Sequence, residues 1–184
     1  MSARTAFTGR IVMLGFGSIG QGTLPLLQRH FTIEPGDITI IAPHPALLAW
    51  RAQAGIDAEF GVPHENVVDV ALTPANYEAV LGEHLNPGDF CVNLTVDVSS
   101  IDVMQWCQER GVLYLDTVVE PWAGTYDNPD LPIAERTNYA LREAMLAAGQ
   151  GPGATTAVTC HGANPGLVSH FAKRALGVLA GKLS

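Results

Sequence analysis

Short apolar runs alternate with segments of helical character along most of the chain. Apolar runs at residues 10–14, 37–41, 67–72, 89–96, 112–115 and 155–160 predict strands. Helical patterns or capping residues predict helices at 21–30, 45–54, 74–84, 99–110, 133–148 and 164–183. Strands that alternate with helices favour βαβ units and a parallel sheet. We therefore expect an α/β fold, a doubly wound parallel sheet with helices on both faces.

A glycine-rich segment follows the first apolar run and leads into the first helical stretch. It consists of Gly15, Phe16, Gly17, Ser18, Ile19 and Gly20. This spacing between a strand and a helix is typical of Rossmann-like dinucleotide binding. Gly15 would permit the tight turn, Gly17 would let a pyrophosphate approach, and Gly20 would let the helix pack closely. All six residues are predicted to bind the cofactor; the alternative is a glycine-rich turn without a ligand.

The domain organisation is simple. Residues 1–9 are expected to form a flexible tail and residues 10–184 one NAD-binding Rossmann domain, with the last helix packed on the sheet. A Rossmann enzyme usually binds its substrate between this domain and a second one, which is absent from the sequence. The chain is therefore expected to be an N-terminal fragment of a longer enzyme, or to need nothing beyond nucleotide binding.

Composition excludes several classes of partner. The formal net charge of −8 argues against a nucleic-acid surface. It suits a cationic small substrate, and equally an ordinary acidic cytosolic protein. No apolar run is long enough to span a bilayer, and the first residues do not predict a secretory signal. Three cysteines, Cys91, Cys107 and Cys160, lack the spacing of a metal site. We expect a cytoplasmic protein with reduced thiols and without a metal, membrane or nucleic-acid partner.

The end of the second predicted strand bears on the choice of cofactor. NAD-binding domains usually place a carboxylate there for the ribose hydroxyls, but Ala42 occupies this position. NADP would need a cationic side chain, and Arg51 is the nearest in sequence. His44 could bond a ribose hydroxyl. These residues favour NAD over NADP.

Polar residues follow three of the predicted strands, at the edge where a doubly wound sheet binds ligands. Glu120 has apolar neighbours that would raise its pKa, so it could act as an acid or base or hold an amine; otherwise it is a surface glutamate. Asp97 is a ligand or a helix cap. Asn164 could orient a nicotinamide or an amine, or cap the last helix. Asp116 could brace a turn, and Trp122 could face a cation or pack the loop.

Four segments together resemble the bacterial homospermidine synthases of the saccharopine dehydrogenase-like group. They are residues 15–20, 91–97, 115–122 and 162–166, and the resemblance extends over residues 9–183. It implies part of a longer NAD-dependent aminoalkyl transferase of polyamine biosynthesis. Such an enzyme makes homospermidine from putrescine, or from putrescine and spermidine, by hydride borrowing through tightly bound NAD. The implied partners are putrescine and, at full length, a second subunit in a homodimer.

The resemblance also suggests roles for individual residues. It implies that Glu120, Asp97 and Asn164 belong to the catalytic site. Within the same segments, cofactor binding is expected of Leu94, Thr95, Thr117 and Ala163. Because the family's catalytic and dimerisation domain would follow, this chain alone is expected to bind NAD without turnover.

Two other functions stay open. One is another saccharopine dehydrogenase-like NAD(P)-dependent oxidoreductase that acts on a carboxylated substrate. That substrate would need a cationic side chain, and residues 93–122 contain no lysine and only Arg110. The other is a non-catalytic NAD-binding module.

Overall fold

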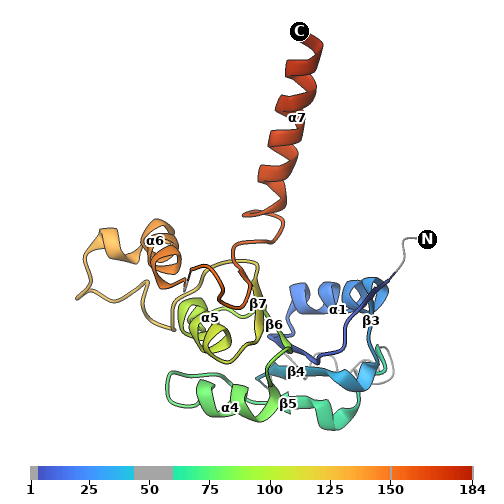
Figure 1. Cartoon of the computed structure of the whole chain (residues 1–184). Helices are drawn as coiled ribbons and strands as arrows, with labels where there is room; N and C mark the ends of the chain where they lie inside the picture. Colours follow the sequence, from blue (N-terminus) through green and yellow to red (C-terminus); the bar gives the residue numbers. More distant parts are fainter. Residues whose placement is uncertain (1–3, 44–59, 150, 184) are drawn as a thin grey trace.

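The computed structural model describes residues 4–43, 60–149 and 151–183. Within these residues, six parallel strands form one sheet in the order β5-β4-β2-β6-β7-β8. Figure 1 labels β4, β5, β6 and β7 of this sheet. Their bounds are β2 Ile11–Leu14, β4 Ile38–Ala42, β5 Val67–Asp69, β6 Phe90–Asn93, β7 Leu113–Asp116 and β8 Ala157–Val158. The chain runs outward from β2 to β5 and then returns to β6, so the strand order reverses between β2 and β6. This confirms the predicted doubly wound parallel sheet.

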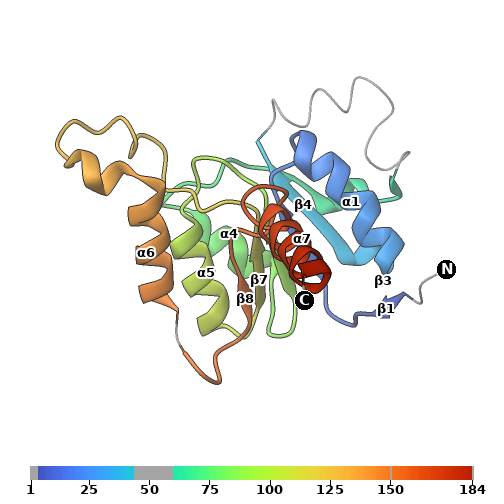
Figure 2. The ribbon, with the colours of Figure 1, turned by 90° about the horizontal axis from the view of Figure 1, so that it is seen from above.

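Helices cover both faces of the sheet, with α1 on one face and α5 and α6 on the other (Figure 2). The α-helices are α1 Ser18–His30, α4 Tyr77–His84, α5 Ser100–Glu109, α6 Asn138–Ala148 and α7 Leu167–Leu183. The described ranges also contain three short 3-10 helices, η1 Pro35–Asp37, η2 His64–Asn66 and η3 Ile133–Arg136. All four side chains of β2 are fully buried. Val12 and Leu14 belong to the core cluster with α4, α5 and α6, and Ile11 and Met13 to the cluster with α1.

Several element boundaries differ from the predicted ones for local reasons. The strand predicted over 89–96 ends at Asn93, because the Asn93 side chain accepts the backbone N–H of Thr95 at 3.1 Å. The helix predicted over 133–148 is divided by Thr137, whose hydroxyl accepts the N–H of Ala140 and begins α6 there. Ser99 caps α5 through the N–H of Asp102, at the start of the helix predicted over 99–110. The helix predicted over 45–54 lies outside the described residues.

A small second sheet joins the N-terminal segment to the end of α1. The strand β1 (Thr5–Ala6) pairs in parallel with β3 (Phe31–Thr32). The ring of Phe7 packs edge-on against Phe31 and Phe90, with centroids 6.1 Å and 6.3 Å away. The structure thus differs at Thr5–Ala6 from the flexible tail expected over residues 1–9.

The last helix, α7, projects away from the domain (Figure 1). Every side chain over residues 167–182 is exposed, including Phe171 at 62% and Leu176 at 65%. The expectation that this helix packs on the sheet is wrong. Its apolar pattern indicated burial, but the first N–H groups of the helix bond the loop before it, Leu167 to Gly162 and Val168 to Ala163. None of the helices in the described part of the chain is long and apolar enough to cross a membrane.

Two leucine-to-alanine substitutions would test this arrangement. Leu81 in α4 is fully buried, so L81A should lower the free energy of unfolding by about 3 kcal/mol. Leu176 in α7 is exposed, so L176A should change it by less than about 0.5 kcal/mol. Urea denaturation of both variants measures the contrast, and an equal loss in L176A would mean that α7 packs on the domain.

Candidate functional site

The turn after β2 brings three strand ends together. Gly15 has φ 88°, a left-handed conformation that side chains disfavour. Its N–H donates to the carbonyl of Ile41 at 2.8 Å. A Cβ added at Gly15 would lie 2.9 Å from the carbonyl oxygen of Leu94. The turn therefore requires glycine at this position for both conformation and space.

The start of α1 is built to receive an anion. A Cβ at Gly20 would lie 2.7 Å from the Gly15 oxygen, so the helix packs directly against the turn. The added Cβ of Gly17 would meet nothing within 4 Å. The first turn of α1 has no side-chain cap and no acidic residue. Its amide donors and positive dipole end are thus left for a ligand such as a phosphate.

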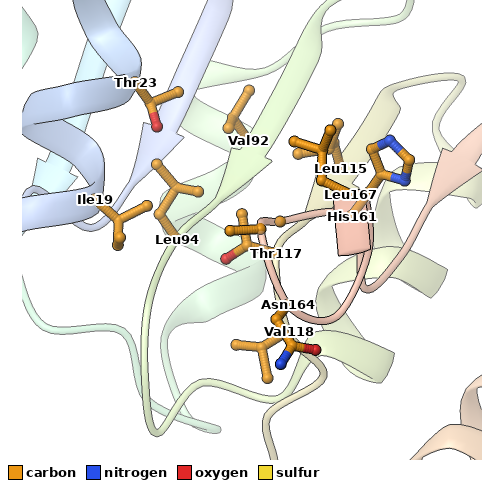
Figure 3. A pocket seen from close by; sticks show the side chains of 12 residues that line it. Ile19, Thr23, Val92, Leu94, Leu115, Thr117, Val118, His161, Asn164 and Leu167 are labelled. Carbon is orange, nitrogen blue, oxygen red and sulfur yellow. The ribbon is translucent and has the colours of Figure 1, made fainter. Parts of the chain in front are cut away.

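Two neighbouring hollows lie along this end of α1. The first, which we call the glycine-turn groove, has a volume of about 360 Å³ and is lined by Gly15, Phe16, Gly17, Ser18, Ile19, Pro43, Leu94, Thr95 and Val96. The second, the strand-end cavity, has a volume of about 480 Å³ and is lined by Ile19, Thr23, Val92, Leu94, Leu115, Thr117, Val118, His161, Gly162, Ala163, Asn164 and Leu167 (Figure 3). Ile19 and Leu94 line both, so one elongated ligand could occupy the two together.

The structure brings most of the predicted cofactor residues to these hollows. Of that set, the groove takes Gly15, Phe16, Gly17, Ser18, Ile19, Leu94 and Thr95, and the cavity adds Thr117 and Ala163. Gly20 lines neither. Phe16 contributes only its backbone to the turn, because its side chain is fully buried with its ring edge-on to Phe60.

Glu120 and Asp97 form an acidic pair on the loops after β7 and β6. The Glu120 N–H donates to the Ser100 hydroxyl at 3.0 Å, and the Ser100 N–H donates to the Glu120 carbonyl at 2.9 Å. Burial raises the pKa of Glu120, and the charge of Asp97 raises it further, while a hydrogen bond with Tyr126 opposes the rise. Asp97 is exposed and has φ 63°. Neither carboxylate lines the groove or the cavity.

Asn164 lies among the residues of the strand-end cavity, on the loop between β8 and α7 (Figure 3). It precedes the cis peptide bond to Pro165 and is exposed. The interpretation of Asn164 as the cap of the last helix is wrong, because α7 begins only at Leu167. The interpretation as a ligand-orienting amide stays a prediction, for a residue that lines the strand-end cavity.

Asp116 was predicted from the sequence only to brace a turn, but it has a larger part in the structure. It is fully buried at the end of β7 and accepts hydrogen bonds from the Cys160 N–H at 2.7 Å and the Tyr114 hydroxyl at 2.9 Å. Burial raises its pKa from 3.8 to about 6, although the hydrogen bonds from Cys160, Tyr114 and Ser100 oppose the rise. A carboxylate between two strand ends thus titrates close to neutrality.

Other residues take structural positions or were missed by sequence reasoning. The Trp122 indole N–H donates to Asp102 at 2.5 Å and its ring contacts Tyr77, so this residue packs the loop. The hydrogen bond between Tyr126 and Glu120 was not predicted. The only sequence feature that could have indicated it is an aromatic residue in the long loop after β7. The prediction also missed several residues that line the groove or the cavity, namely Thr23, Pro43, Val92, Val96, Leu115, Val118, His161, Gly162 and Leu167.

Ala42 lies where the sequence predicted it, at the end of the second strand of the main sheet. Ala42, only 1% exposed, ends β4, and Pro43 lines the groove beyond it. His44 and Arg51 lie outside the described residues. Within the described ranges, no group of three or more histidine, cysteine, aspartate or glutamate side chains could hold a metal ion.

Comparison with known proteins places this geometry in a family. The saccharopine dehydrogenase NADP binding domain matches residues 11–158, most of the chain. The chain belongs to this family. It is 48% identical over 179 residues to a homospermidine synthase of Blastochloris viridis, covering 95% of this chain and 36% of that protein. It is 46% identical over 177 residues to a homospermidine synthase of Mesorhizobium japonicum, covering 94% of this chain and 35% of that protein.

A solved structure is also similar. The crystal structure of the homospermidine synthase from Legionella pneumophila in complex with NAD superposes with a TM-score of 0.79 at 36% identity, covering 97% of this chain and 35% of that one. The resemblance predicted from the four segments is confirmed. The chain spans about a third of the length of the relatives it matches.

The raised pKa of Asp116 predicts a pH-dependent stability. Between its unfolded pKa of 3.8 and its folded pKa of about 6, the folded state binds more protons, so stability falls as the pH rises. Relative to D116N, the free energy of unfolding of the wild type should fall by about 2 kcal/mol between pH 4 and pH 7. Urea denaturation of both proteins across this range measures the difference, and a difference independent of pH would contradict the shift.

Proposed function

We propose that this chain is the NAD-binding portion of a homospermidine synthase. The observation that carries the proposal is the pair of adjoining hollows at the N-terminus of α1, with the acidic pair on the loops beyond. The groove has the volume and open amides for a dinucleotide's phosphates, and the cavity continues from it toward the ends of β7 and β8. The relatives of known name and the NAD complex of a similar structure support it.

The residues present fit NAD. Gly17 leaves open space where a pyrophosphate would approach, and the first amides of α1 would bind it. Asn164 and Thr117 would contact the nicotinamide end in the cavity. When bound, NAD would supply the acceptor and later the donor of a hydride. None of the described residues lining the groove carries a cationic side chain for a 2′-phosphate, which supports NAD rather than NADP.

Glu120 and Asp97 would hold an ammonium group of the substrate. The two carboxylates repel each other, which is part of the reason for the raised pKa of Glu120. A cation between them would relieve this repulsion. The raised pKa also suits Glu120 to receive and return protons while an amine forms or releases an imine. We propose putrescine as the diamine.

The competing functions have weaker support. A carboxylated substrate would need a cation near the acidic pair, but the Arg110 guanidinium lies 4.5 Å over the Trp106 ring on α5. A non-catalytic NAD-binding module would leave the acidic pair without a ligand. The homodimer and the cytoplasmic location stay predictions.

Replacing Gly17 tests the dinucleotide site without disturbing the fold. Its backbone has φ −74° and its Cβ would face open space, so G17V should fold normally and fill the groove. We expect at least about tenfold weaker NAD binding by isothermal titration calorimetry.

Gly22 provides the matched control. It lies farther along α1, exposed and with nothing within 4 Å of an added Cβ. G22A should keep wild-type NAD affinity. A wild-type chain that is folded and does not bind NAD would contradict the proposed function.

Removing the charge of Glu120 tests the diamine site. With NAD bound, E120Q should bind putrescine about tenfold more weakly, because a charged partner of the ammonium is lost. Wild-type affinity should rise as the pH increases through the raised pKa of Glu120, and E120Q should lose this dependence. Calorimetric titration with putrescine, with exposed E135Q as the control, measures both.

The same titration separates the alternatives. Tighter binding of ornithine than of putrescine would favour an oxidoreductase for carboxylated substrates. Binding of NAD without any diamine would contradict the assignment of Glu120 and Asp97 as a diamine site of this chain. The relatives are about three times as long as this chain, so the tests rely on binding and not on turnover.

A further inference from the structure

We propose that Asp116 is a positioning residue for the dinucleotide site: it fixes the three strand-end loops that surround the strand-end cavity. The inference rests on the proposed NAD binding and adds a residue that contacts no ligand. Asp116 itself lies outside the lining of both hollows. It would act through the residues it holds.

Asp116 binds the loop after β8 at two points. Its Oδ1 accepts the Cys160 N–H at 2.7 Å, and its backbone carbonyl accepts the His161 N–H at 3.0 Å. The next residues, Gly162, Ala163 and Asn164, line the cavity. Thr117, directly after Asp116, lines the same cavity. Asp116 therefore ties the cavity wall at residues 162–164 to the end of β7, through its carboxylate at Cys160 and its backbone carbonyl at His161.

A chain of buried hydrogen bonds joins Asp116 to the loop after β6. The Tyr114 hydroxyl donates to Asp116 Oδ2 at 2.9 Å, and Asn93 Nδ2 donates to the Tyr114 oxygen at 3.1 Å. Asn93 Oδ1 accepts the Thr95 hydroxyl at 2.5 Å and the Thr95 N–H at 3.1 Å. Tyr114, Asn93 and Asp116 are each at most 3% exposed. We call this series the Asp116 relay.

The direction of the relay depends on the ionised carboxylate. Every group donates toward Asp116, and the series can end there because a carboxylate only accepts. A protonated carboxyl, or an asparagine, can present a donor to the Tyr114 hydroxyl. When residue 116 donates there, the Tyr114 O–H loses its buried carboxylate acceptor, so the directed series is one bond short. Because Asn93 also holds Thr95, a weakened series would loosen Thr95 and Leu94, which contact the Gly15 turn.

The surroundings of Asp116 contain no compensating charge from the groups that act on it. Tyr114 on β7, Cys91 on β6 and Cys160 after β8 have raised pKa values and are neutral at pH 7. Ser100 on α5 is a neutral donor. The carboxylate is the one charge of this group, and its pKa near 6 places the change within an accessible pH range.

The test is the pH dependence of NAD affinity. Isothermal titration calorimetry from pH 5 to pH 8 would compare the wild-type chain with D116N, and with D130N as an exposed charge control. We expect wild-type binding to weaken about tenfold from pH 7.5 to pH 5, with a midpoint near 6, because a charge-assisted hydrogen bond is lost. D116N should bind weakly at every pH without this midpoint, and D130N should follow the wild type.

Y114F provides a second, independent variant should D116N fail to fold. It keeps the Asp116 carboxylate and its Cys160 bond but removes the relay, and it should bind NAD several-fold more weakly at pH 7.5. A folded D116N that keeps wild-type affinity, or keeps the wild-type midpoint, overturns the inference while NAD binding stands. Wild-type affinity in Y114F overturns the relay. A wild type that binds no NAD at any pH overturns the proposed function as well.

Discussion

The contact between the backbones of Gly15 and Leu94 determines the geometry of the whole site. No side chain fits between them, since a Cβ would lie 2.9 Å from the Leu94 oxygen. The Leu94 N–H bonds the Leu14 carbonyl, and the Gly15 N–H bonds that of Ile41, so β2, β4 and β6 end at one point. Because α1 starts three residues later, its free amides point to a fixed place beside both hollows.

Groups that attract anions and groups that attract cations occupy different parts of the site. The amide end of α1 attracts anions, whereas Glu120 and Asp97 attract cations. A dinucleotide carries its phosphates at one end of the site, and an amine would approach from the other. The two ligands would therefore not compete for the same electrostatic surface. The net charge of −8 is consistent with a cationic second ligand. It does not give the position of the binding site, which is defined by the loops that carry Glu120 and Asp97.

The sequence predicted what depends on local chain pattern, and missed what depends on distant contacts. The glycine segment, the six parallel strands and the Ser99 cap follow from spacing and residue type within a few positions. The two-residue strands β1 and β3 are too short to show alternation, and their pairing follows from Phe7 packing between Phe31 and Phe90. Asp116 looked like a turn residue because Cys160, whose N–H its carboxylate accepts, lies far away in the sequence, after β8. Asn164 looked like a cap because the proline after it is typical of a helix start.

The exposure of α7 has a consequence for cooperativity. The printed side-chain contacts of this 17-residue helix with the rest of the described chain are confined to its first turn, at Leu167 and His170. The remainder is only marginally stable in water, and Gly177 and Gly181 lower its helix propensity further. Its helix–coil equilibrium is therefore separate from the folding of the sheet. Amide hydrogens of α7 should exchange with solvent far faster than those of β2, whose strand opens only with the domain. The chain thus combines one cooperative unit with a terminal segment that melts gradually.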